Sequence, residues 1–191
     1  MTSDRIRAYS ALEYGDPTGF LHKLDELEPR VASSNMDRKV RTLRTNSLKP
    51  WRELREAALF SHFMSERIGV PILIAKGEDQ DYDFVATWQS GDTRTFSPVQ
   101  IKEIVPEDLN PSADLEKVIT SLSKYASSTD LTIAIHLNRR VKFDLSMIQV
   151  PELSIAALWL FGAISSDARR WGLWGDLLAE PIGTAHDYPV T

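Results

Sequence analysis

The spacing of apolar residues along the sequence changes near residue 70, from every three to four positions to every second position. This change limits the possible folds more than any other feature. Residues 50–69 repeat apolar side chains every three to four positions, between a proline at the start and a glycine at the end. That pattern is typical of an amphipathic helix. The following apolar runs have a period of two and are separated by short polar turns, over 70–76, 81–89 and 94–104. They predict a three-stranded antiparallel meander after the helix.

A helix and a strand are expected after the meander. Residues 110–128 carry apolar side chains on one helical face, and residues 130–138 are rich in strand-forming residues. A strand, a helix and another strand imply a parallel crossover. Residues 153–163 fit a fifth strand or a buried helix, and residues 169–176 are expected to form a helical or irregular cap. The order α–β–β–β–α–β predicts an α/β fold with a mixed sheet flanked by helices.

The first 49 residues indicate a helical extension, with short helices over 18–28 and 33–45. We therefore divide the chain into this extension (1–49) and an α/β domain (50–191). A length of 191 residues is enough for one full core, and the absence of cysteine excludes disulfides and thiolate metal sites. The first residues lack an apolar secretion signal, and the most apolar segment is too short to cross a bilayer. We expect a soluble, cytoplasmic protein that makes no membrane contact.

Charge is unevenly distributed along the chain. The net charge is −5, yet residues 30–67 contain 9 basic and 4 acidic residues, an excess of +5. An acidic protein does not coat nucleic acid by bulk attraction. The basic stretch is either a solvated helix face with a linker or an arm that contacts phosphates.

One set of polar residues falls inside elements that should be buried. Gln100 and Lys102 are two apart in a strand and therefore share a face, while Asp83 begins the neighbouring strand. Glu56 lies in an apolar stretch of the first core helix. Oxygen ligands of this kind suit Mg²⁺, and a nearby lysine lowers the pKa of a metal-bound water. Other acids compete for two of these roles: Asp79 and Asp81 for that of Asp83, and Glu53 for that of Glu56.

These residues, in this order of elements, resemble the PD-(D/E)xK nuclease superfamily over residues 50–138. The resemblance implies a restriction endonuclease-like three-layer core that hydrolyses DNA phosphodiester bonds with Mg²⁺ or Mn²⁺. Asp83, Gln100 and the Ile101 carbonyl would hold the metal, Lys102 would assist the attacking water, and Glu56 would complete the site. DNA is then the expected partner, and a homodimer is possible.

The sequence departs from the superfamily pattern at two positions. "DYDF" stands where a proline normally precedes the aspartate, and Gln100 supplies no negative charge. A second hypothesis is therefore a catalytically inactive nuclease-fold module that binds nucleic acid or a protein. A third is a structural protein that dimerises through its tail. His136 is interpreted as a structural histidine. If the nuclease assignment holds, Lys102→Ala should abolish cleavage and leave the fold intact.

Overall fold

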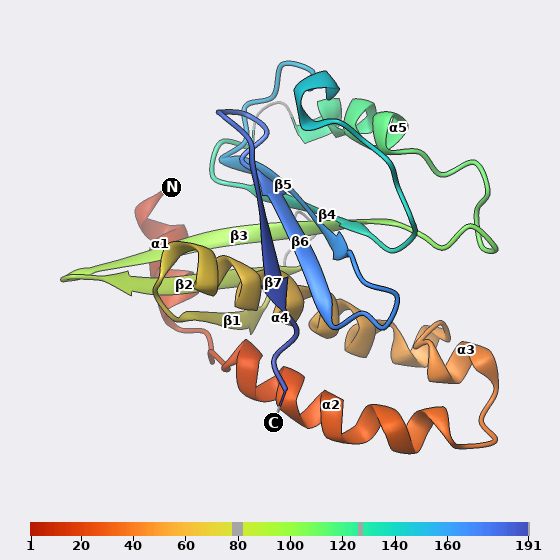
Figure 1. Ribbon diagram of the computed structural model, residues 1–191. Helices are drawn as coiled ribbons and strands as arrows, with labels where there is room; N and C mark the ends of the chain where they lie inside the picture. Colours follow the sequence, from red (N-terminus) through yellow and green to blue (C-terminus); the bar gives the residue numbers. More distant parts are fainter. Residues whose placement is uncertain (78–81, 126–127, 191) are drawn as a thin grey trace.

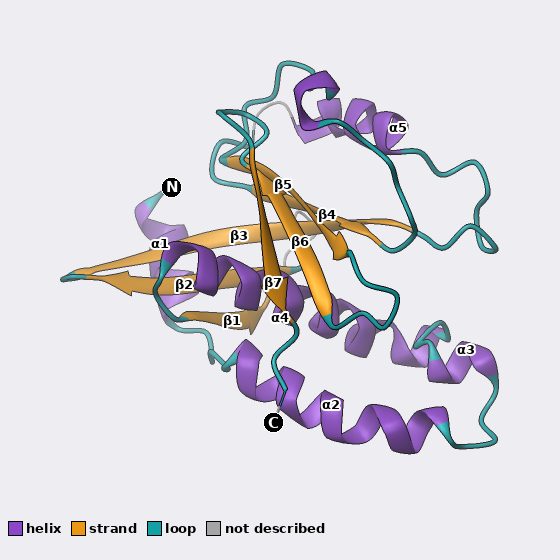
Figure 2. Cartoon of the chain, in the orientation of Figure 1, coloured by secondary structure: helices purple, strands orange, loops and turns teal. Residues whose placement is uncertain are grey.

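The computed structural model describes residues 1–77, 82–125 and 128–190. Seven strands form one mixed sheet in chain order, β1 to β7, and helices lie against both faces (Figures 1 and 2). The helices are α1 (Ser3–Ser10), α2 (Pro17–Ala32), α3 (Arg38–Arg41), η1 (Asn46–Leu48), α4 (Lys49–Ile68), α5 (Leu115–Thr120), η2 (Ser121–Tyr125) and η3 (Leu145–Met147). The strands are β1 (Ile72–Lys76), β2 (Phe84–Ser90), β3 (Thr93–Ile104), β4 (Thr132–Leu137), β5 (Ala157–Ala163), β6 (Arg170–Gly175) and β7 (Ile182–Asp187).

The first half of the sheet has the predicted order. Helix α4 carries Pro50 in its first turn and ends at Gly69, whose φ of 70° is the left-handed conformation that glycine adopts without strain. Strands β1, β2 and β3 form the antiparallel meander, and β3 pairs in parallel with β4 after the crossover through α5. The expected α–β–β–β–α–β order and the mixed α/β class are therefore confirmed.

Strand β3 joins two halves of the sheet. Residues Thr93–Val99 pair with β2, and residues Val99–Ile104 pair with β4. Val99 is the one residue of β3 that has a partner on both sides in these registers. Figure 1 shows β5, β6 and β7 crossing the direction of β1–β3 at a steep angle. The long strand β3 thus passes from the meander to a second group of strands.

The second half of the chain differs from the prediction. Residues 157–163 form strand β5, and the expected cap over 169–176 is instead strand β6, which pairs with β7. Gly172 of β6 and Gly183 of β7 explain why the sequence pattern did not indicate this pair of strands. A side chain at either position would collide with the Trp174 ring, so each position requires a glycine. These glycines leave room for the indole and also interrupt the alternation that identifies a strand. The helix expected over 110–128 is also shorter, since α5 gives way to the 3₁₀ turn η2 at Ser121.

Two large apolar cores cover the two faces of the sheet, and a smaller cluster forms around Tyr9, Val85 and Phe96. On one face α4 and α2 pack on the strands, with Phe63 and Leu21 fully buried. On the other face the segment around α5 packs on Ile133 and Ile135. The N-terminal extension therefore contributes directly to the first core. Within the described ranges, none of the helices combines the length and the apolar character needed to cross a membrane.

The close approach of β4 and β5 gives a stability prediction. A Cβ atom at Gly162 would lie 2.9 Å from both the Cβ atom and the backbone oxygen of Leu137, and the backbone cannot yield as a flexible side chain can. We expect Gly162→Ala to lower the free energy of unfolding by about 1–3 kcal/mol. Urea denaturation measures this loss. Gly15→Ala is the matched control, because a Cβ there meets no atom within 4 Å; equal stability of the two variants would contradict the packing argument.

Candidate metal site

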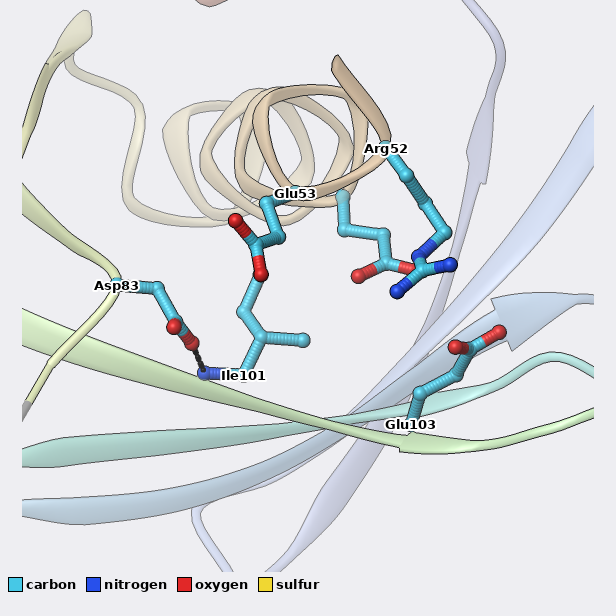
Figure 3. A pocket seen from close by; sticks show the side chains of 6 residues that line it. Arg52, Glu53, Asp83, Ile101 and Glu103 are labelled. Atoms are coloured by element: carbon cyan, nitrogen blue, oxygen red, sulfur yellow. Dashed lines mark hydrogen bonds between the residues drawn. The ribbon is translucent and has the colours of Figure 1, made fainter. Parts of the chain in front are cut away.

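An acidic pocket lies between the first half of α4 and the strands β2 and β3. Its lining consists of Arg52, Glu53, Glu56, Asp83, Ile101 and Glu103. Figure 3 shows the α4 side chains directed toward β3, with Asp83 beside the Ile101 backbone. The volume is about 110 Å³, enough for a cation and several waters. Four carboxylates and one guanidinium therefore surround a space in which an ion can bind.

The alternation of β3 decides which of its side chains reach the pocket. Ile101 and Glu103 are two residues apart and line it, whereas Lys102 points to the other face of the sheet. There its ammonium nitrogen lies 5.4 Å from the ring centre of Tyr125. Lys102 is therefore not among the residues that line the pocket with Asp83, although its positive charge still acts on the Asp83 carboxylate. The spacing of Gln100 and Lys102 correctly places both on one face, but that face is turned away from α4.

Asp83 immediately precedes β2, and its side chain continues the hydrogen bonding to β3 where the β2 backbone no longer pairs with it. One of its carboxylate oxygens accepts a hydrogen bond from the backbone N–H of Ile101 at 2.6 Å. The same oxygen accepts a hydrogen bond from the side-chain amide of Gln100. That amide nitrogen also donates to the Ile101 carbonyl oxygen at 3.2 Å. The structure thus brings Asp83, Gln100 and Ile101 together, but as hydrogen-bond partners of one another.

The pKa of Asp83 is raised above its ordinary value. Burial is the main cause, because removing water disfavours the charged carboxylate. The negative charges of Glu53 and Glu56 act in the same direction, while the Ile101 N–H and the more distant Lys102 act against it. Asp83 is therefore a carboxylate that holds its proton more tightly than an exposed one.

Glu56, Glu103 and His136 form a second, tighter group next to Asp83. Each offers one ligand atom, and these three atoms lie within 4.8 Å of one another. Glu56 and His136 are buried, and an oxygen of Glu56 lies 3.2 Å from Nδ1 of His136. The His136 ring is held in place by stacking on Phe161, with 4.8 Å between ring centres. Two carboxylates and an imidazole at this spacing fit a divalent cation such as Mn²⁺.

Glu103 already has two partners within the chain. The Arg44 guanidinium makes two hydrogen bonds to its carboxylate, one of them 2.9 Å long, and Asn138 donates a third at 2.7 Å. Burial on its own would raise the pKa of Glu103, but the hydrogen bonds from Arg44 and Asn138 outweigh it and lower the pKa. Glu103 is therefore held in its charged form.

Sequence reasoning did not select Glu103 or His136 as candidate ligands. In the structure they are direct partners in the parallel register of β3 and β4, and Glu103 shares a face with Ile101. Among the competing acids, Glu53 lines the pocket together with Glu56, so both contribute to it. Asp79 and Asp81, the alternatives to Asp83, lie outside the described residues. Comparisons with protein-family models, curated proteins and solved structures find no match.

The raised pKa of Asp83 predicts a pH-dependent stability. Because the folded protein binds this proton more tightly, the stability contributed by Asp83 is full below the ordinary aspartate pKa and is lost as pH rises through the raised value. Asp83→Asn keeps an acceptor for the Ile101 N–H and removes the buried charge. We expect it to raise the melting temperature at pH 7 by about 2–4 °C, and by less at pH 4.

Calorimetry at the two pH values provides the measurement. Asp144→Asn is the control, because this exposed carboxylate has its pKa lowered by hydrogen bonds from Ser146. That substitution should not stabilise the protein at pH 7. A melting temperature of Asp83→Asn below that of the wild type at pH 7 would refute the buried-charge interpretation.

Proposed function

We propose that this protein is a divalent-metal-dependent nuclease that hydrolyses DNA phosphodiester bonds in the acidic pocket beside α4. The observation that carries the proposal is the convergence of Glu56, Glu103 and His136, whose ligand atoms lie within 4.8 Å of one another. These three residues would hold the cation. Mg²⁺ or Mn²⁺ at such a site polarises a phosphoryl oxygen and lowers the pKa of a bound water.

Two further residues of the pocket have the chemistry that hydrolysis needs. Asp83, with its raised pKa, is suited to accept a proton from an attacking water, because a general base works best when its pKa approaches the working pH. Arg52 lines the same pocket, and its Nε is buried with no hydrogen-bond partner in the described part of the chain. An unpaired guanidinium donor is suited to a phosphate oxygen.

The choice of DNA as substrate rests on charge. The basic stretch 30–67 has an excess of +5 and includes α3, with three cationic residues in four positions, and the start of α4. Through Arg44 and Arg52 this stretch reaches the acidic pocket itself. Basic groups next to a metal site bind the phosphate backbone and present a phosphodiester to it. The same charges support binding of the substrate even though the whole protein is acidic.

The position of Lys102 favours a second candidate function. A nuclease of the type that the sequence resembles uses a lysine beside its metal, but here the Lys102 ammonium lies over Tyr125 on the other face. Gln100 also supplies no charge to the site. A protein with this arrangement could bind DNA without cutting it. Strong, salt-sensitive DNA binding with no metal-dependent cleavage would identify this alternative.

Nicking of supercoiled plasmid in Mg²⁺ or Mn²⁺ tests the proposal. Glu56→Gln removes a charged ligand and keeps the shape of the side chain, so we expect the cleavage rate to fall by at least about a hundredfold. Lys102→Ala should retain the rate within about threefold, because Lys102 lies outside the pocket. The matched control is Lys124→Ala, since Lys124 also lies over the Tyr125 ring, 5.0 Å from its centre.

Each outcome of this experiment has a distinct meaning. If a folded Lys102→Ala variant loses cleavage and Glu56→Gln does not, the lysine-centred site of the sequence resemblance is correct and the pocket assignment is wrong. If the wild type binds DNA but cuts neither plasmid nor branched DNA with either metal, the binding module is supported. Circular dichroism of each variant confirms that the fold is retained.

A further inference from the structure

Arg44 occupies the place of a counterion at the candidate metal site. Its guanidinium binds both carboxylate oxygens of Glu103, one of the three clustered ligands. The two side chains are only 14% and 12% exposed, so this ion pair is largely removed from water. The hydrogen bonds to Glu103 raise the pKa of Arg44, and the nearby charge of Glu56 acts in the same direction. The chain therefore supplies its own positive charge where a divalent cation would bind.

The segment that carries Arg44 is short and strained. Arg44 lies between α3 and η1, and the preceding Leu43 has a φ of 56°. A leucine in this left-handed conformation is strained, so other contacts must hold the segment in place. The Arg44 backbone N–H donates to the Lys39 carbonyl at 2.6 Å, and Arg38 of α3 pairs with Asp108 on the surface. Release of the Arg44 side chain from Glu103 would leave this backbone hydrogen bond and the exposed Arg38–Asp108 pair intact.

We propose that Arg44 competes with the metal for Glu103 and that a substrate phosphate draws it away. This inference rests on the proposed function of the pocket. A guanidinium binds a phosphate through the same two-pronged geometry that it uses with a carboxylate. When Arg44 turns to the phosphate, Glu103 remains as a buried charge without its main partner, which is unfavourable until a cation binds. Nucleic acid and metal therefore bind cooperatively, and Arg44 is the residue that couples them.

Cooperative binding has a strict thermodynamic consequence. If DNA raises the affinity for the metal by some factor, the metal raises the affinity for DNA by the same factor. The coupling should disappear when Arg44 is replaced by a neutral side chain, because Glu103 is then available to the metal whether or not DNA is present. Arg44→Gln should consequently behave like a protein whose metal site is permanently open.

Binding of Mn²⁺, followed by the electron paramagnetic resonance signal of the free ion, tests this inference. The titration is done with and without a short phosphorothioate-linked DNA duplex, which keeps its charge and resists hydrolysis. We expect DNA to tighten Mn²⁺ binding to the wild type by at least about fivefold, and Arg44→Gln without DNA to bind Mn²⁺ at least about fivefold more tightly than the wild type. DNA should add little to the affinity of Arg44→Gln.

Arg38→Gln is the matched control. It removes one positive charge from the same segment, but from an exposed pair with Asp108 that does not contact Glu103. Its Mn²⁺ affinity without DNA should equal that of the wild type. Although the loss of a basic residue from α3 weakens DNA binding, the fold increase in Mn²⁺ affinity at saturating DNA should match that of the wild type. Arg44→Lys keeps a charge without the planar two-pronged contact, so it should show an intermediate affinity and a weaker response to DNA.

The possible failures are distinguishable. If the wild type and a folded Arg44→Gln bind Mn²⁺ equally, or if DNA leaves the wild-type affinity unchanged, the role of Arg44 is refuted and the metal site stands. If neither the wild type nor any variant binds Mn²⁺, the metal site falls and this inference falls with it. Should Arg44→Gln fail to fold, the wild-type response to DNA and the Arg44→Lys titration decide the question.

Discussion

Mutual repulsion among four carboxylates is the constraint around which this molecule is arranged. Like charges in a poorly hydrated space oppose one another, and each needs a partner if the fold is to persist. The structure supplies these partners: Gln100 and a backbone N–H for Asp83, His136 for Glu56, Arg44 for Glu103, and Lys49 for the more exposed Glu53. Residues far apart in sequence are therefore required at one place. Gathering so much negative charge in one place does not stabilise the fold, which is consistent with the proposed role of the pocket as a cation site.

The sheet provides the positions that these partners need. The parallel register of β3 and β4 sets Glu103 beside His136, and helix α4 brings Glu56 to the same point from above the strands. His136 is fixed by its stacking on Phe161, which belongs to the core under α4. The polar site thus rests directly on the apolar packing that stabilises this face of the sheet.

Sequence reasoning was most successful where a pattern has one structural solution. The change of period near residue 70 correctly predicted α4 and the meander. The strand–helix–strand order correctly predicted the parallel pairing of β3 and β4. It failed for β6, because glycines that make room for Trp174 hide the alternation. In β3 it established that Gln100 and Lys102 share a face, but periodicity alone cannot say which face meets the helix. Glu103 was passed over for that reason, and His136 because the register between strands depends on the whole sheet.

The way in which β3 divides its pairing between two neighbours has a further consequence. The first half of β3 pairs with β2 of the meander, and the second half pairs with β4. The change from one neighbour to the other takes place at Val99. Asp83 is attached to the first group of strands, while Glu103 is carried by the second. Val99 is therefore the junction between the strands that carry Asp83 and those that carry Glu103. The hydrogen bonds from Gln100 and the Ile101 N–H to the Asp83 carboxylate cross this junction, so they hold the two groups of strands together beside the pocket.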